Sequence, residues 1–139
     1  MIRIIFITLI FTTLLSCQSQ DKKTTGSKEY VAIYKSDTAF LSITMDKNRF
    51  YGTLKIFNRG VSPDSGSIEG DIKGNNLVGT YYYTPHRSRE PKRKAFALLK
   101  NQDTFVEGTG LQQIYMGIPY YEPSSLSFDN PKFIYKEKK

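Results

Sequence analysis

Residues 66–84, GSIEGDIKGNNLVGTYYYT, decide the fold. Apolar residues or glycines alternate with polar ones on both sides of the Gly74-Asn75 pair. Strict alternation is typical of half-buried β-strands, and a Gly-Asn pair between two such runs predicts a tight β-hairpin. The inner faces of the two strands are Ile68, Gly70 and Ile72 in the first, and Leu77, Gly79, Tyr81 and Tyr83 in the second.

The same pattern continues on both sides of this hairpin. Further alternating runs separated by turn residues lie at 29–35, 38–45, 49–58, 92–100, 104–108, 124–128 and 132–135. The inner face of 92–100 stays open, because both sets of alternate residues there are apolar. Residues 110–123 are less regular. The sequence therefore predicts an all-β domain of eight to nine strands, and about eight strands suit a small antiparallel up-and-down barrel.

Composition agrees with one β-rich domain. The chain has 139 residues, with ten Tyr, nine Phe and no Trp, and aromatic residues favour strands. Glycines at 52, 70 and 79 fall on predicted inner faces, as expected where strands bend sharply around a crowded interior. We place the domain at residues 29–139.

The N-terminus has the pattern of a targeting segment. Arg3 supplies a positive start and residues 4–15 are almost wholly apolar, which is too short for a mature membrane span but suits a secretory signal peptide. The only cysteine, Cys17, follows directly, so no intrachain disulfide can form. Residues 18–28 contain no apolar side chain that could build a core and predict a flexible tether.

Leu14-Leu15-Ser16-Cys17 resembles the lipobox of bacterial lipoproteins. The resemblance implies a signal peptide at residues 1–16, cleavage before Cys17, and acyl chains on Cys17 that anchor a segment 17–28 to a membrane. Several acyl chains give stable anchoring, whereas one gives marginal binding. The residue after Cys17 is Gln18 and not the aspartate that resembles an inner-membrane retention signal. We therefore expect the protein in the cell envelope, anchored to the outer membrane on either its periplasmic or its surface face.

Glycine and apolar spacing between residues 50 and 110 is similar to that of the small lipocalin-like barrel lipoproteins of Bacteroidota. The similarity covers about half of the chain. It implies a fold and a location but no reaction, since function does not follow from a fold.

Few residues in this sequence could support catalysis or bind a metal ion. His86 is the single histidine, and Cys17 is expected to be lipidated, so neither a nucleophile with its base nor a set of metal ligands is recognisable. Glu69 and Asp71 share one strand face about 7 Å apart at strand rise, but they alternate with the inner residues and should face water. We therefore expect no enzyme, no metal and no cofactor.

A basic segment spans residues 86–94. Its candidate anion contacts are Arg87, Arg89, Lys92, Arg93 and Lys94, which could bind phosphate groups of lipids or acidic polymers. A solubilising loop at one rim of the barrel is the interpretation that we favour from sequence. Nucleic acid is not expected, because no interleaved aromatic residues offer a platform for bases.

Tyrosines are the candidate contacts for a ligand or partner. The set comprises Tyr81, Tyr83, Tyr115, Tyr120 and Tyr121. Core packing is the commoner role for the first two. Residues 111–122 are unusually apolar for a loop, and we expect them to cover the mouth of the barrel and to contact any small apolar ligand or partner protein.

Three functions remain open from sequence. The first is a monomeric, non-enzymatic envelope lipoprotein whose barrel binds a small ligand or a partner protein. The second is an inhibitor of a lysozyme or protease, although the net charge of +7 for the whole chain would repel a basic lysozyme. The third is an enzyme acting on glycans or lipids, which would need a buried carboxylate with a shifted pKa inside a pocket.

Overall fold

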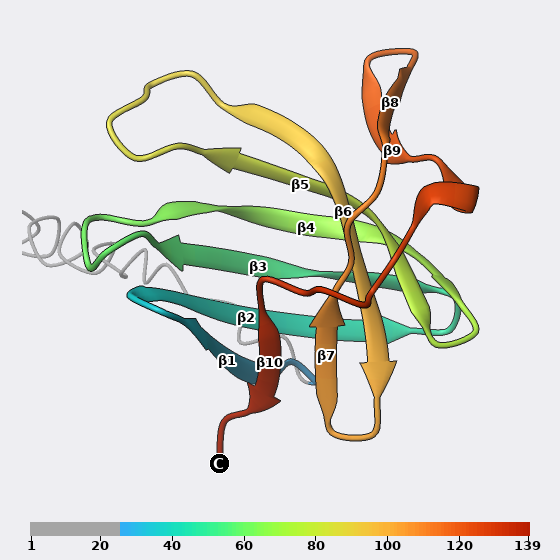
Figure 1. Cartoon of the computed structure of the whole chain (residues 1–139), viewed down its shortest axis with the longest axis horizontal. Coiled ribbons are helices and arrows are strands. Elements are labelled where there is room, and N and C mark those ends of the chain that lie inside the picture. Colours follow the sequence, from blue (N-terminus) through green and yellow to red (C-terminus); the bar gives the residue numbers. More distant parts are fainter. Residues whose placement is uncertain (1–25) are drawn as a thin grey trace, which may run out of the picture.

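The computed structural model describes residues 26–139, and Figure 1 shows them as a single β domain. The predicted signal peptide, Cys17 and most of the predicted tether lie outside the described residues. The strands are β1 Lys28–Tyr34, β2 Asp37–Asp46, β3 Arg49–Phe57, β4 Asp64–Lys73, β5 Asn76–Thr84, β6 Lys92–Asn101, β7 Thr104–Glu107, β8 Gln112–Tyr115, β9 Ile118–Tyr121 and β10 Ile134–Glu137. Within this part of the chain, no helix has the length and apolar character needed to cross a membrane.

Eight of the strands form a closed antiparallel barrel in the order β1-β10-β7-β6-β5-β4-β3-β2. Neighbours in sequence are neighbours in the barrel except where the β8–β9 hairpin is inserted between β7 and β10. Pairing of β1 with β10 closes the ring, so the barrel has no free sheet edge between these strands. The prediction of a small lipocalin-like, up-and-down barrel of about eight strands is confirmed.

The hairpin predicted from residues 66–84 has the expected register. Lys73 pairs with Asn76 across a two-residue turn in which Gly74 has a φ of 62°, a conformation that glycine adopts without steric cost. Ile68 pairs with Tyr81 and Ile72 with Leu77, so apolar side chains from both strands meet inside the barrel. Local alternation and turn chemistry were enough to specify this element.

Side chains fill the inside of the barrel. Tyr30 packs edge-on against Phe105, and Phe133 lies next to Tyr135 with ring centroids 5.9 Å apart. The largest fully buried side chains are Tyr81, Tyr135, Phe50, Phe105, Phe133, Leu41, Leu54, Ile68, Leu77 and Leu98. An eight-stranded barrel packed with aromatic rings is stabilised by apolar burial along its whole length.

Gly70 and Gly79 face each other where β4 and β5 bend around Phe50. A Cβ atom on Gly70 would lie 2.6 Å from the Cα atom of Gly79, 2.8 Å from Cε1 of Phe50, and in collision with the carbonyl oxygen of Val78. No L side chain fits there without moving backbone. The expectation that inner-face glycines mark sharp bends in a crowded interior holds at this pair.

The structure differs from the prediction between residues 110 and 135. Residues 124–128 do not form a strand: a 3₁₀ helix covers Pro123–Ser125, and Ser127 makes an isolated bridge to Thr109. The closing strand β10 begins at Ile134, two residues later than expected. Residues 112–121 form a separate two-stranded sheet instead of an irregular mouth cover, because their own Met116-Gly117 turn, with φ of 48° and 78°, lets them pair locally.

Candidate functional site

The β8–β9 hairpin packs against the outer wall of the barrel. Thr80 on β5 and Ala95 on β6 are paired, point outward, and are nevertheless buried, and Ala97 on β6 is buried with them. The backbone N–H of Ala95 donates a hydrogen bond of 2.9 Å to the Oε1 atom of Gln112 on β8. Phe96 and Leu98 take the inner face, so both apolar sets of β6 are used, one for the core and one for the hairpin.

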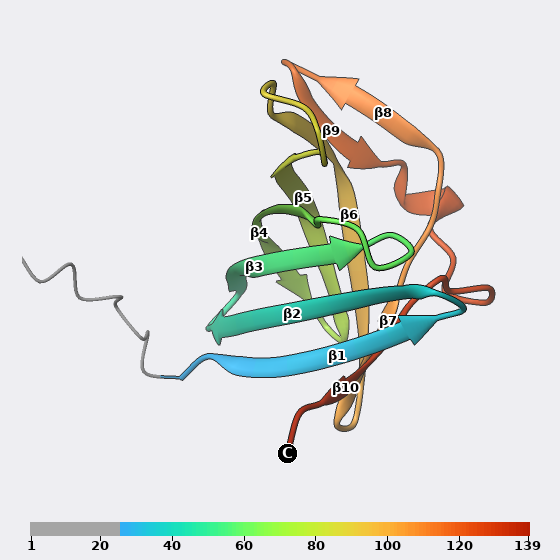
Figure 2. The same cartoon turned by 90° about the vertical axis from the view of Figure 1, so that its left-hand side faces the viewer.

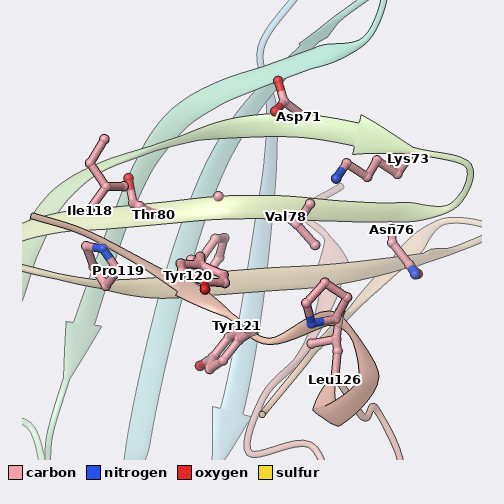
Figure 3. Close-up of a pocket in the computed structure, with 13 residues that line it drawn as sticks. Asp71, Lys73, Asn76, Val78, Thr80, Ile118, Pro119, Tyr120, Tyr121 and Leu126 are labelled. Atoms are coloured by element: carbon pink, nitrogen blue, oxygen red, sulfur yellow. The ribbon is translucent and has the colours of Figure 1, made fainter. Parts of the chain in front are cut away.

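A cleft of about 380 Å³ lies between this hairpin and the outer face of β4 and β5 (Figure 3). Its apolar wall includes Val78 on β5 together with Ile118 and Tyr120 on β9, and Leu126 closes one side. Asp71, Lys73 and Asn76 supply polar groups at the β4–β5 end. An apolar wall with a few polar groups at its margin is the usual character of a site for a small ligand.

The structure does not bring the five predicted tyrosines into one site. Tyr120 and Tyr121 line the cleft, whereas Tyr115 lies beside the hairpin turn and is 70% exposed. Tyr81 is fully buried in the barrel, where its hydroxyl lies 3.0 Å from the carbonyl oxygen of Leu54 and 3.1 Å from that of Asp64. Tyr83 stacks on Tyr81 with ring centroids 4.5 Å apart.

The basic residues 86–94, like the tyrosines, do not form one site. Arg87 and Arg89 are exposed in the loop between β5 and β6, and Lys92 and Arg93 are exposed at the start of β6. Arg93 lies over the ring of Tyr82 on the outer face, 5.3 Å from its centroid. Lys94 belongs to the inner side, with Nζ 5.6 Å from the centroid of Tyr81 and 5.7 Å from that of Tyr83.

Asp64 organises the rim of the barrel beside this loop. Its carboxylate accepts a 2.6 Å hydrogen bond from the backbone N–H of His86 and thereby ties the start of the β5–β6 loop to β4. Burial raises the pKa of both Tyr81 and Tyr83, and the negative charge of Asp64 adds to the rise. These tyrosines remain neutral hydrogen-bonding and stacking groups at physiological pH.

Glu107 is an acid on the inner side of the barrel that the sequence did not single out. It pairs with Leu98 and lies two residues after the fully buried Phe105, so its side chain takes the same inner face as Phe105. Burial raises the pKa of its carboxyl, while the charges of Lys94 and Lys132 and the backbone N–H of Phe133 partly offset the rise. The hydroxyl of Tyr135 is buried nearby without a hydrogen-bond partner, and burial together with the charge of Glu107 raises its pKa.

This raised pKa predicts a pH-dependent cost to stability. Between the ordinary pKa of 4.5 and the higher folded value, the folded chain keeps a proton that the unfolded chain has released, so stability falls as pH rises through that window. Glu107→Gln cannot ionise. We expect its free energy of unfolding to exceed that of the wild type at neutral pH, and the difference to shrink toward about pH 4, where the unfolded glutamate also takes up a proton.

Urea denaturation at a series of pH values measures this difference. Glu69→Gln is the matched control, because Glu69 is exposed on the outer face of β4 and loses the same charge. A stability difference for Glu107→Gln that stays constant across the pH range would contradict the burial of an ionised carboxylate as its cause.

Metal ligands do not cluster in the part of the chain that the structure describes: residues 26–139 contain no group of three or more His, Cys, Asp or Glu that could hold an ion. Glu69 and Asp71 are both exposed on the outer face of β4, as their alternation with Ile68 and Ile72 predicted. Asp71 lies at the cleft and Glu69 is not part of its lining. The cleft therefore presents one carboxylate, which is suited to recognition of a polar group.

Comparison of the chain with protein-family models, with curated proteins and with solved structures found no match. The candidate site therefore rests on the geometry of this structure alone. Sequence reasoning missed Val78 and Asn76 as cleft residues, whereas Ile118 lies within the segment 111–122 that it chose as the ligand contact. A usable signal was present in β6, since a strand that is apolar on both faces needs cover outside the barrel as well as a core inside.

Proposed function

We propose that the protein is a non-enzymatic lipoprotein of the cell envelope, anchored through Cys17, that binds a small amphipathic ligand in the cleft between β8–β9 and β4–β5. The observation that carries this proposal is the composition of the cleft. A wall of Val78, Ile118 and Tyr120 suits an apolar body, and Asp71, Lys73 and Asn76 suit a polar head.

The packing of the barrel favours this outer cleft over the interior as the ligand site. Rings of Tyr81, Phe105 and Tyr135 occupy the space that a hollow barrel would offer to a ligand. Entry of even a small ligand there would require displacement of buried aromatic side chains, which costs several kcal/mol for each ring removed from its packing. The hairpin cleft requires no such displacement.

The envelope location rests on sequence. The apolar leader and the residues Leu14-Leu15-Ser16-Cys17 support export and lipid attachment, with the outer membrane as the favoured membrane. A lipid anchor would hold the barrel at a membrane, close to lipid fragments dissolved in it. Such fragments have an apolar body and a polar head, as the cleft requires.

An enzymatic role has one observation in its favour and a stronger one against it. Glu107 is a carboxyl group whose pKa is raised by burial, as a catalytic acid would need. However, it faces the packed interior and does not line the cleft, where Asp71 is the single acid. The carboxylate with the raised pKa and the space for a substrate are thus in different places.

Native mass spectrometry of the full-length protein, purified from envelope membranes in mild detergent, tests the proposal. We expect a small molecule that is retained under gentle conditions and lost on denaturation. Val78→Arg places a long charged side chain in the cleft from an outward position and should abolish retention. Thr53→Arg adds the same side chain to the exposed outer face of β3 and should leave retention intact.

Two outcomes would overturn the proposal. One is a bare mass for the wild type together with no binding of the fluorescent probe 1-anilinonaphthalene-8-sulfonate. The other is a retained molecule that is unaffected by Val78→Arg, which would place the ligand elsewhere in the molecule.

A further inference from the structure

The tip of the β8–β9 hairpin is the most exposed apolar element of the described chain. The exposed fractions are 70% for Ile114, 70% for Tyr115 and 84% for Met116. Residues 108–121 contain no charged side chain at all. Soluble surfaces rarely gather such side chains on one projecting turn unless the turn contacts another apolar phase.

The tip stands beyond the barrel and apart from the cleft. Figures 1 and 2 both place the β8–β9 turn at the end of the molecule opposite the β6–β7 turn and the C-terminus. The hairpin residues that line the cleft are Ile118–Tyr121, whereas Ile114, Tyr115 and Met116 do not line it. The contacts that form the cleft therefore leave the tip uncovered.

Positive charge gathers at the same end of the molecule. Both views place the β5–β6 loop toward the same upper end of the molecule as the hairpin turn, and Figure 1 shows the two well separated across that end. This loop carries the exposed side chains of Arg87 and Arg89, and its start is held by the hydrogen bond from His86 to Asp64. The apolar tip and the basic loop are thus two separated features of one end of the molecule, and a flat bilayer can touch both.

We infer that this end of the protein is a membrane-binding surface, in which the hairpin tip enters the interfacial region of an anionic lipid bilayer while Arg87 and Arg89 contact lipid phosphates. Amphipathic insertion combined with basic residues is the physical basis of peripheral membrane attachment. Tyr115 is suited to the interface because its ring is apolar and its hydroxyl is polar.

Backbone pairing makes shallow insertion feasible. Tyr115 pairs with Ile118 directly beside the turn, so the two strands stay paired up to the tip. Ile114 lies opposite Pro119, which has no backbone N–H that would need a partner. Unpaired backbone groups are the main cost of placing irregular chain in a bilayer, and a tight two-residue turn limits their number. The outer edges of the hairpin stay at the headgroup level, where water and lipid oxygens can bond them.

The predicted lipid anchor is compatible with this orientation and is not required for it. The residues between Cys17 and the start of β1 at Lys28 can extend over about 35–40 Å. A ten-residue strand such as β4 spans about 33 Å. An anchored chain can therefore reach the bilayer while the hairpin end of the barrel faces it.

The absence of tryptophan from the chain allows a single-site test. Met116→Trp places a fluorescent reporter at the tip, and Ile33→Trp places one at another exposed apolar position, 73% exposed, on β1. The full-length protein carrying each change is reconstituted with vesicles of phosphatidylcholine and phosphatidylglycerol. Half of the samples contain lipids brominated on their acyl chains, which quench tryptophan in the membrane.

We expect blue-shifted emission from Met116→Trp and its loss in brominated vesicles, with little change for Ile33→Trp. Arg87→Ser combined with Arg89→Ser, replacement of the anionic lipid by phosphatidylcholine, and high salt should each reduce the quenching. Emission of Met116→Trp that is the same in brominated and ordinary vesicles would overturn the inference, and a blue shift without quenching would show that the tip is buried in a protein contact instead. Ligand retention is measured separately, so failure of the membrane surface and failure of the cleft give different results.

Discussion

Gly70→Val is expected to prevent the barrel from forming. A valine side chain at this position would collide with the backbone of Val78 and Gly79 and with the ring of Phe50, a fully buried residue. Backbone cannot move away from this contact without breaking the pairing of β4 with β5. The cost of such overpacking and backbone displacement exceeds about 4 kcal/mol, which approaches the whole stability of a small domain.

Circular dichroism and urea denaturation of the purified variant measure this effect. Ser67→Val is the matched control, because Ser67 lies on the exposed outer face of the same strand, where valine should change stability by no more than about 0.5 kcal/mol. Gly70→Val with an unfolding transition like that of the wild type would show that β4 and β5 do not approach as closely as Gly70 and Gly79 indicate.

Ala95→Glu is expected to detach the β8–β9 hairpin while the barrel stays folded. Ala95 points outward, and its small side chain is buried between β6 and the hairpin. A glutamate there would have to bury a carboxylate beneath the hairpin or push the hairpin away, and burying an unpaired charge costs several kcal/mol. Detachment costs less than unfolding, because β6 keeps its pairing with β5 and its inner residues Phe96 and Leu98.

Hydrogen exchange by mass spectrometry distinguishes detachment from unfolding. Exchange should speed up in residues 109–127 and stay slow in β2 to β5, and the retained ligand should be lost with the cleft. Arg93→Glu is the control, because residue 93 is the preceding outward position on β6 and is exposed. Unchanged exchange in residues 109–127 of Ala95→Glu would contradict the packing of the hairpin on the barrel wall.

The two proposals give the hairpin two separate roles. Strand β9, from Ile118 to Tyr121, forms one wall of the cleft, and the turn with Ile114, Tyr115 and Met116 forms the proposed membrane surface. A ligand taken from a bilayer would thus enter a cleft whose wall continues into the inserted tip. Ala95→Glu should impair both properties, whereas Val78→Arg should impair ligand retention alone.

Local patterns determined most of the barrel. Alternation placed Leu41, Leu54, Ile68 and Tyr81 in the core, and the Gly74-Asn75 turn set the register of the central hairpin. These features are readable because strands β1 to β7 pair in sequence order, so turn chemistry and a period of two carry the needed information. The leader and the lipidation of Cys17 were predicted from local sequence too, and they stay predictions because these residues lie outside the described part of the chain.

Tertiary structure decided what lies outside the barrel and which tyrosines are accessible. Residues 112–121 pair with each other and pack on Thr80, Ala95 and Ala97, a choice that depends on how two apolar surfaces fit in space. That fit leaves Tyr115 exposed and places Tyr120 and Val78 in one cleft, whereas Tyr81 is buried inside the barrel, as its alternation predicted. The sequence by itself determined which residues form strands and which way they face. Only the closed barrel, by exposing an apolar outer wall on β5 and β6, decided where the remaining hairpin packs and so where the cleft and the protruding tip are found.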